Sequence, residues 1–196
     1  ERTINAIFED RIKDYRASLK EGGIALDYAL RPVIRKPTSI DSFSQPSVFS
    51  ADGRINKALG APVVVNNYIY EFTGNKGTDG DLKTYWEGAS NAFPNVLTAD
   101  LIHSYDIDCA VLKLNPQRIW GKRTQEIEVQ VSTDGIEYVT SAGVHEYLFD
   151  PDENSNSIVI SLGTNARYVR IIFSKNSGAA AGQLAELEVY VQENSK

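Results

Sequence analysis

From residue 55 onward, hydrophobic and polar residues alternate in short runs. Residues 126–131 alternate strictly, with Ile127, Val129 and Val131 at the hydrophobic positions. This period predicts a strand with one buried face and one wet face. Comparable runs, separated by turn residues, lie at 63–65, 96–101, 110–114, 147–149, 158–162, 168–173 and 187–191, and we interpret 68–72 as a continuation of the first. Many short strands with no helical pattern among them predict an antiparallel β-sandwich.

The beginning of the chain has a different period. Residues 3–20 carry an apolar stripe at three- and four-residue steps, made of Ile4, Ile7, Phe8, Ile12, Tyr15 and Leu19. This spacing predicts a helix, which Gly22 and Gly23 end. Residues 31–53 contain three prolines and many serines, which is typical of an extended connector. We therefore expect a helical appendage and connector over 1–54 and the β-sandwich over 55–193. The helix is interpreted as packing on its own domain, ending an upstream domain or pairing with a partner.

Composition and charge exclude several classes of protein. The 196 residues are 42% hydrophobic and 23% charged, which fits a folded soluble protein. A net charge of -6 without a Lys/Arg cluster argues against nucleic acid as a partner, and no apolar run is long enough for a membrane span. Cys109 is the only cysteine, so no intrachain disulfide forms. Because the chain begins at Glu1 and has no Met, we expect it to be a piece of a longer protein.

A loop at 74–84 is rich in glycine and oxygen ligands. Asp79 and Asp81 are separated only by Gly80, and Thr84 adds a hydroxyl. Hard oxygen ligands on a tightly turning backbone suit Ca²⁺. The spacing differs from that of an EF-hand, and a plain solvated turn remains the alternative.

Candidate catalytic groups are scarce. His103 and His145 are the only histidines, and neither lies beside a Ser/Asp or Cys arrangement of recognisable spacing. Glycoside hydrolysis needs two acids facing across a cleft, whereas Asp79 and Asp81 are assigned to the metal loop. We therefore expect the chain not to be an enzyme.

Several segments occur in an order that resembles discoidin domains, also called coagulation factor V/VIII type C domains. The resemblance extends over residues 55–191 and is carried by residues 56–63, 78–87, 97–101, 128–135, 167–171 and 184–190. The closest resemblance is to bacterial carbohydrate-binding module family 32. The paired cysteines that bracket many animal members are missing here, which favours a microbial source.

The resemblance implies a jelly-roll β-sandwich, of the galactose-binding-domain-like kind, with one structural Ca²⁺. Its ligands would be the side chains of Asp79, Asp81, Thr84 and Glu186, with backbone oxygens from Asn75 or Lys76 and from Ala185. For Glu186, the alternative is an ordinary carboxylate on a surface strand.

The resemblance also places a sugar site in the loops near this metal. Sugars need aromatic platforms surrounded by planar polar groups. The candidate ligand-binding residues are Trp86, Glu87, Trp120, Arg123, Asn176 and Gln183, with Tyr68 and Tyr70 as a further wall. The alternatives left open are a core position for Trp86, capping of the sandwich by Trp120, a surface ion pair for Arg123, turn capping by the two amides, and sheet packing of the two tyrosines.

The function implied is that of a non-catalytic, calcium-stabilised carbohydrate-binding module. It would hold an attached secreted glycoside hydrolase or surface protein on a glycan, downstream of a catalytic domain. The expected ligand is a galacto-configured sugar or an α-glucan, and the expected location is extracellular or at a microbial cell surface. The alternative is a cell-surface adhesion domain of the same fold that binds a protein or lipid partner.

Overall fold

A computed structural model of the chain describes residue 51 and residues 54–191. The expected N-terminal helix and the boundary at residues 54 and 55 fall outside or at the edge of this part, so both stay predictions. Within the described residues, no helix is both long enough and apolar enough to cross a membrane.

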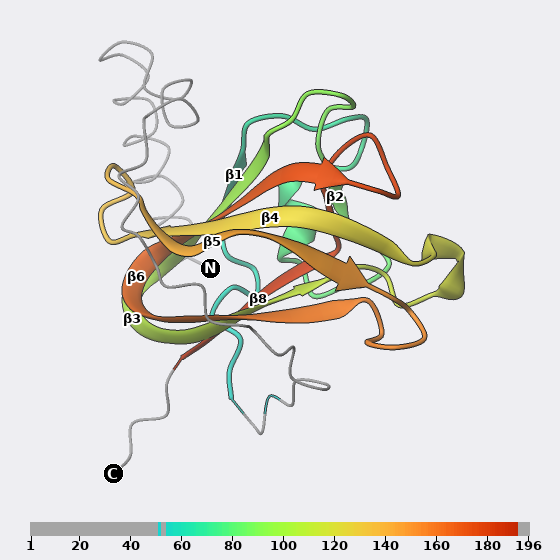
Figure 1. The fold of residues 1–196 in the computed structure, drawn as a ribbon. Coiled ribbons are helices and arrows are strands. Elements are labelled where there is room, and N and C mark those ends of the chain that lie inside the picture. Colours follow the sequence, from blue (N-terminus) through green and yellow to red (C-terminus); the bar gives the residue numbers. More distant parts are fainter. Residues whose placement is uncertain (1–50, 52–53, 192–196) are drawn as a thin grey trace, which may run out of the picture. The chain divides into compact units, whose positions relative to one another are not determined.

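The described part is built almost entirely from antiparallel strands (Figure 1). The strands are β1 (Val63–Val65), β2 (Trp86–Glu87), β3 (Asn95–Lys113), β4 (Arg123–Ser132), β5 (Val139–Phe149), β6 (Ser157–Asn176), β7 (Gln183–Leu184) and β8 (Glu186–Val191). The main sheet has the order β1-β3-β6-β4-β5, and β8 also pairs with β3. β2 and β7 form a separate two-stranded sheet. Two short 3₁₀ turns, η1 (Gly74–Gly77) and η2 (Arg118–Trp120), lie in the connections. This is the antiparallel β-sandwich expected from the alternation.

The two longest strands each serve both layers of the sandwich. β3 pairs with β1 through Leu97–Ala99 and with β8 through Ile107–Lys113. Between these stretches its register against β6 shifts, and Ile102 has a φ of 75°. Figure 1 shows β3 and β6 bending together at this end. Such irregularities let a strand turn a corner without ending. The sequence therefore predicted two strands where the structure has one bent strand, in β3 and again in β6.

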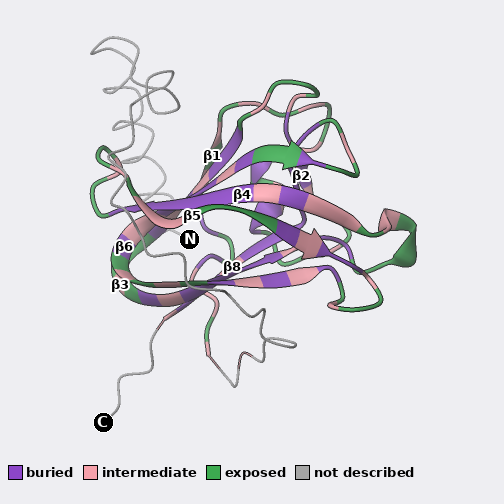
Figure 2. Cartoon of the chain, viewed as in Figure 1, coloured by how far each residue is buried: buried purple, intermediate pink, exposed green. Residues whose placement is uncertain are grey.

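The hydrophobic core lies between the layers, where the buried stretches of the strands face one another (Figure 2). Its largest fully buried side chains include Trp86, Phe149, Phe173, Leu97, Ile127 and Ile171. Cys109 is buried as expected, and burial raises the pKa of its thiol to about 11. That thiol is therefore a packing group rather than a reactive one.

Two local predictions were wrong. Residues 68–72 form a loop rather than a strand, and Tyr70 has a φ of 48°, which lies outside the β region. The face of β4 expected to be wet is largely covered, because Gln130 is only 1% exposed. Glu128 accepts hydrogen bonds from Gln130 and Thr140, so this face holds a polar network in place of water.

Candidate functional site

The acidic loop is folded by its own side chains. The two Asp79 carboxylate oxygens accept from the backbone N–H of Asp81 (2.9 Å) and the hydroxyl of Thr84 (2.7 Å). Asp81 accepts from the backbone N–H of Lys83 through its carboxylate (2.9 Å) and from the Thr84 hydroxyl through its carbonyl (3.1 Å). Gly80 has a φ of 83°, a conformation that favours glycine. The turn therefore gathers oxygens on a compact backbone.

Glu186, the first residue of β8, lies far along the sequence from this loop but contacts it in the fold. Its carboxylate is buried, with the residue 3% exposed, and Oε1 accepts from the N–H of Gly80 at 2.7 Å. Burial raises the pKa of Glu186 to about 8; the Gly80 N–H opposes the shift, whereas Asp79 and Glu188 add to it. A buried carboxylate beside a second one is an arrangement that a cation would stabilise.

The predicted metal ligands are only partly assembled. Asp79, Thr84 and Glu186 converge around Gly80, whereas the carboxylate of Asp81 faces Lys83. Asn75 lies in η1, which packs against β8, and its carbonyl accepts from the N–H of Thr78. Ala185 directly precedes Glu186 and donates its N–H to Lys113. In the part of the chain that the structure describes, no group of three acidic, His or Cys side chains surrounds a single point. Two carboxylates with hydroxyl and carbonyl oxygens nevertheless form a donor set that suits Ca²⁺.

Trp86 is a core residue, which is the alternative that the sequence left open. The residue is 0% exposed, and its ring packs 5.6 Å from that of Phe173. Its indole N–H donates to the carbonyl of Asn67 at 3.1 Å. Strand alternation places the next side chain, Glu87, on the opposite side of β2, where it is half-buried.

Three predicted ligand residues form one chain of hydrogen bonds. Gln183, paired with Glu87 across β2 and β7, donates its amide N–H to Glu87 Oε2 at 2.9 Å. Its amide oxygen accepts from Arg123 Nη1 at 2.6 Å. These two bonds fix which way the Gln183 amide points. We call Glu87, Gln183 and Arg123 the polar relay.

Asn176 lies next to the relay and bonds mainly to its own turn. Its amide N–H donates to the carbonyl of Ala181 (2.8 Å) and to Gln125 Oε1 (3.1 Å), and its oxygen accepts from the N–H of Gly178 (2.9 Å). It reaches Gln183 Oε1 only at 3.5 Å. Asn176 therefore caps the turn that follows β6, as the alternative interpretation held.

An aromatic cluster lies beside the relay. Tyr85 stacks on Phe72 with ring centroids 4.4 Å apart and meets the half-buried Trp120 edge-on at 4.7 Å. The Arg123 guanidinium lies over the Trp120 ring at 5.2 Å, so the cluster and the relay are continuous. Tyr68 and Tyr70 are exposed on the preceding loop, with Tyr70 at 82%.

Arg123 is enclosed by more than the Trp120 ring. Gly178 lies against it as well, because an added Cβ at Gly178 would come within 2.8 Å of Arg123 Nε. Nε is buried and has no hydrogen-bond partner among the described residues. Burial lowers the pKa of Arg123, while Glu87 opposes the shift. The surface ion pair considered for Arg123 is therefore replaced by an enclosed, relay-bound guanidinium.

The fold and these residues agree with a known family. The model of the F5/8 type C domain matches residues 64–187, which is more than half of the chain. This chain belongs to the F5/8 type C domain family. No curated protein sequence matches this F5/8 type C domain.

Solved structures of similar fold include bacterial carbohydrate-binding modules. CpGH89CBM32-4 from Clostridium perfringens, in complex with glcNAc-alpha-1,4-galactose, is 17% identical with a TM-score of 0.56, covering 71% of this chain and 95% of its own. CBM32-3 from a family 31 glycoside hydrolase of the same organism is 18% identical with a TM-score of 0.57 (72% and 97%). Chitosan-binding module 2 from Paenibacillus sp. IK-5, in complex with chitotriose, is 23% identical with a TM-score of 0.54 (69% and 99%). At these identities the likeness shows the fold.

Two members of the aromatic cluster, Phe72 and Tyr85, were not among the predicted ligand-binding residues. Tyr85 precedes the buried Trp86, so strand alternation would have placed it outward beside Glu87. Phe72 gave no such signal, because it lies in a loop that was interpreted as a strand. The stacking of Phe72 on Tyr85 could not be predicted from the sequence, because the fold brings the two rings together.

Proposed function

We propose that this F5/8 type C domain is a non-catalytic carbohydrate-binding module. The observation that carries the proposal is the continuity of the aromatic cluster with the polar relay at one end of the sandwich. An aromatic ring beside planar polar groups is what a sugar needs, because it offers both C–H faces and hydroxyls. Structural neighbours of the same fold are carbohydrate-binding modules, two of them in complex with glcNAc-alpha-1,4-galactose and chitotriose.

The residues divide the work of binding. Trp120, edge-on to Tyr85, offers a half-exposed ring for a pyranose face. Glu87 offers a half-buried carboxylate whose Oε2 accepts from Gln183, and its other oxygen would accept from sugar hydroxyls. Arg123 and Gln183 are largely committed to each other and to Glu87, and they keep that carboxylate in place. A shallow site of this kind predicts weak single-site affinity.

Calorimetric titration tests this assignment. We expect Trp120→Ala and Glu87→Gln each to lower the affinity for the bound sugar by about tenfold, or about 1.4 kcal/mol. The titrants are glcNAc-alpha-1,4-galactose, chitotriose and maltotriose. His103→Ala, an exposed change on the β3 bend, is the matched control and keeps wild-type affinity.

The outcomes separate the candidate functions. Full sugar affinity in both Trp120→Ala and Glu87→Gln would place the ligand elsewhere. Absence of binding to a broad glycan panel, together with capture by protein or lipid surfaces, would favour the adhesion domain instead.

We also propose that one Ca²⁺ stabilises the acidic loop. Asp79, Thr84 and Glu186 would hold it, with oxygens from Asp81, Asn75 and Ala185 completing the set. Support comes from the buried Glu186 carboxylate lying against the Asp79 loop. The ion would supply positive charge there and tie β8 to the loop that precedes β2.

The biological setting is likewise part of the proposal. The module would act outside the cell or at its surface, attached to a carbohydrate-active enzyme. Weak affinity is then sufficient, because tethering raises the local concentration of the enzyme at the glycan. The neighbour from a family 31 glycoside hydrolase supports such an attachment.

A further inference from the structure

The turn that carries Trp120 is bracketed by two basic residues. Arg118 begins η2, and Lys122 follows it after Gly121. Arg118 Nε lies 2.7 Å from Asp152 Oδ1. Lys122 Nζ lies 2.9 Å from Asp150 Oδ2 and 3.4 Å from Glu153 Oε1. All three acids belong to the connection between β5 and β6, so one loop holds the Trp120 turn on both of its sides.

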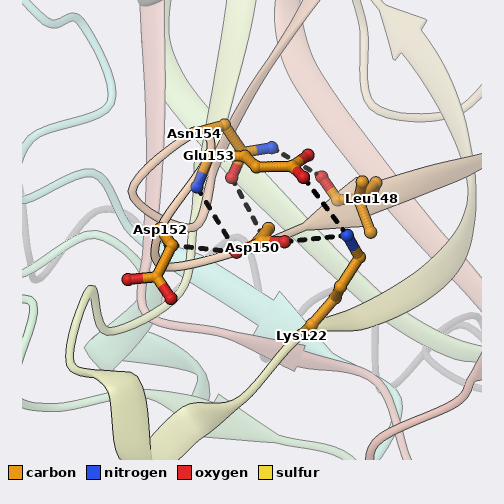
Figure 3. A network of polar contacts seen from close by, with 6 residues as sticks. All are labelled: Lys122, Leu148, Asp150, Asp152, Glu153 and Asn154. Carbon is orange, nitrogen blue, oxygen red and sulfur yellow. Dashed lines mark hydrogen bonds and ion pairs between the residues drawn. The ribbon is translucent and has the colours of Figure 1, made fainter.

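The connection between β5 and β6 is organised around the carboxylate of Asp150, which pairs with Lys122 (Figure 3). Asp150 Oδ1 accepts from the backbone N–H groups of Asp152 (2.9 Å) and Glu153 (3.3 Å). Asn154 ties the loop back by accepting from the N–H of Asp150 and donating to the carbonyl of Leu148. The Asp150 side chain is only 9% exposed. The acid is therefore fixed by its surroundings, and forming the pair orders mainly Lys122.

Within η2, packing against the core comes from Trp120, which is partly buried there. None of the residues of η2 is buried, and Ile119 is 88% exposed. Gly121 follows with a φ of 62° and open space around it. Besides the core, the Trp120 ring meets Tyr85 in an edge-on arrangement and carries the Arg123 guanidinium over its face, and all of these are contacts of the side chain. The three ion pairs of Arg118 and Lys122 are thus the main polar contacts between this turn and the rest of the described domain.

We propose that Lys122 and Arg118 are positioning residues for Trp120, and that their ion pairs with Asp150, Glu153 and Asp152 form an ionic clamp. The clamp makes sugar affinity depend on salt even when the sugar is uncharged. This inference rests on the proposed function, since it gives the Trp120 platform its rigidity. Lys122 carries most of the effect because its partner is enclosed, whereas Arg118 and Asp152 are both exposed and screened.

The first experiment needs no ligand. Acrylamide, a neutral quencher, reports exposure of Trp120, because Trp86 is fully buried. In the wild type, quenching of Trp120 should rise between about 0.02 M and about 0.5 M NaCl, because salt weakens the attraction within the ion pairs and the turn then exposes Trp120 more often. Lys122→Met should show the high quenching at both salts, and Lys122→Arg should restore the wild-type response. Lys57→Met removes one positive charge away from the turn and serves as the control.

The second experiment adds the uncharged sugars glcNAc-alpha-1,4-galactose and maltotriose. We expect the wild type to lose affinity by about fivefold over the same salt range, and Lys122→Met to be about fivefold weaker at low salt and insensitive to it. Salt-independent quenching and affinity in the wild type would overturn the clamp while leaving sugar binding intact. Conversely, salt-dependent quenching without sugar binding would keep the clamp and overturn the function. The salt series on the unaltered protein decides the case if Lys122→Met fails to fold.

Discussion

At the scale of single residues, Arg123 shows how the site is held. Its guanidinium lies over the Trp120 ring and close to Gly178, and its Nη1 donates to the Gln183 amide oxygen. The partnerless Nε costs about 1–3 kcal/mol, which the contact with the ring partly offsets. The position of Arg123 therefore depends on the narrow space that Gly178 leaves.

Gly178→Ala tests that dependence. The new Cβ would lie 2.8–2.9 Å from three atoms of Arg123, so the flexible side chain must shift and release Gln183. We expect sugar affinity to fall by about threefold to tenfold, with a melting temperature close to wild type. Gly143→Ala is the matched control, because its Cβ would meet nothing within 4 Å. Unchanged calorimetric affinity in Gly178→Ala would show that Arg123 does not position the relay.

At the scale of elements, the acidic loop and β8 depend on each other. Gly80 and Glu186 are 106 positions apart and share a 2.7 Å hydrogen bond. The carboxylate of Glu186 is therefore buried close to Asp79, and burial together with Asp79 raises the pKa of Glu186. A bound cation would offset the free-energy cost of keeping these two carboxylates charged and close together.

Calcium removal is the corresponding test. Calcium at about 100 times its dissociation constant should stabilise the wild-type fold by about 2.7 kcal/mol, and chelator should remove this gain. Thermal melts with CaCl₂ and with EDTA measure it. Glu186→Gln keeps the shape of the side chain and should show almost no calcium response. Identical melting curves for the wild type in both buffers would contradict the metal assignment.

The ionic clamp has its own pH dependence. The hydrogen bond from Lys122, followed by the N–H of Asp152, lowers the pKa of Asp150. A lowered folded-state pKa means that this contribution is present above the unfolded value of about 4 and is lost as the pH falls through the folded one. Acrylamide quenching of Trp120 should thus stay constant from about pH 8 to 5 and rise below about pH 4. An increase already near neutral pH would show that another group controls the turn.

Local sequence patterns predicted where strands occur better than they predicted how long each strand is. Alternation identified the buried faces of β4 and β6, because a half-buried strand must repeat every two residues. It failed where β3 turns a corner near Ile102, since a bend interrupts the period without ending the strand. It also failed at Glu128 and Gln130, which look solvent-facing by type but bond to each other and to Thr140.

At the scale of the molecule, the fold brings distant groups to one end. Glu87, Arg123 and Gln183 come from β2, β4 and β7 and form a single relay. Each was named from its residue type and loop position, but the contacts among them could not be read from spacing. For Trp86, the sequence left both a core position and a ligand contact open, because only the packing of β2 against Phe173 shows which side chain of β2 faces inward.

The indole N–H resonances of the two tryptophans, followed by NMR during a sugar titration, test the central claim most directly. Trp86 Nε1–H is bonded to Asn67 in the core, whereas Trp120 lies at the proposed platform. With glcNAc-alpha-1,4-galactose, chitotriose or maltotriose, we expect the Trp120 signal to move saturably and the Trp86 signal to stay in place. A saturable sugar response that leaves the Trp120 signal unmoved, or no response to any glycan of a broad panel, would contradict the account.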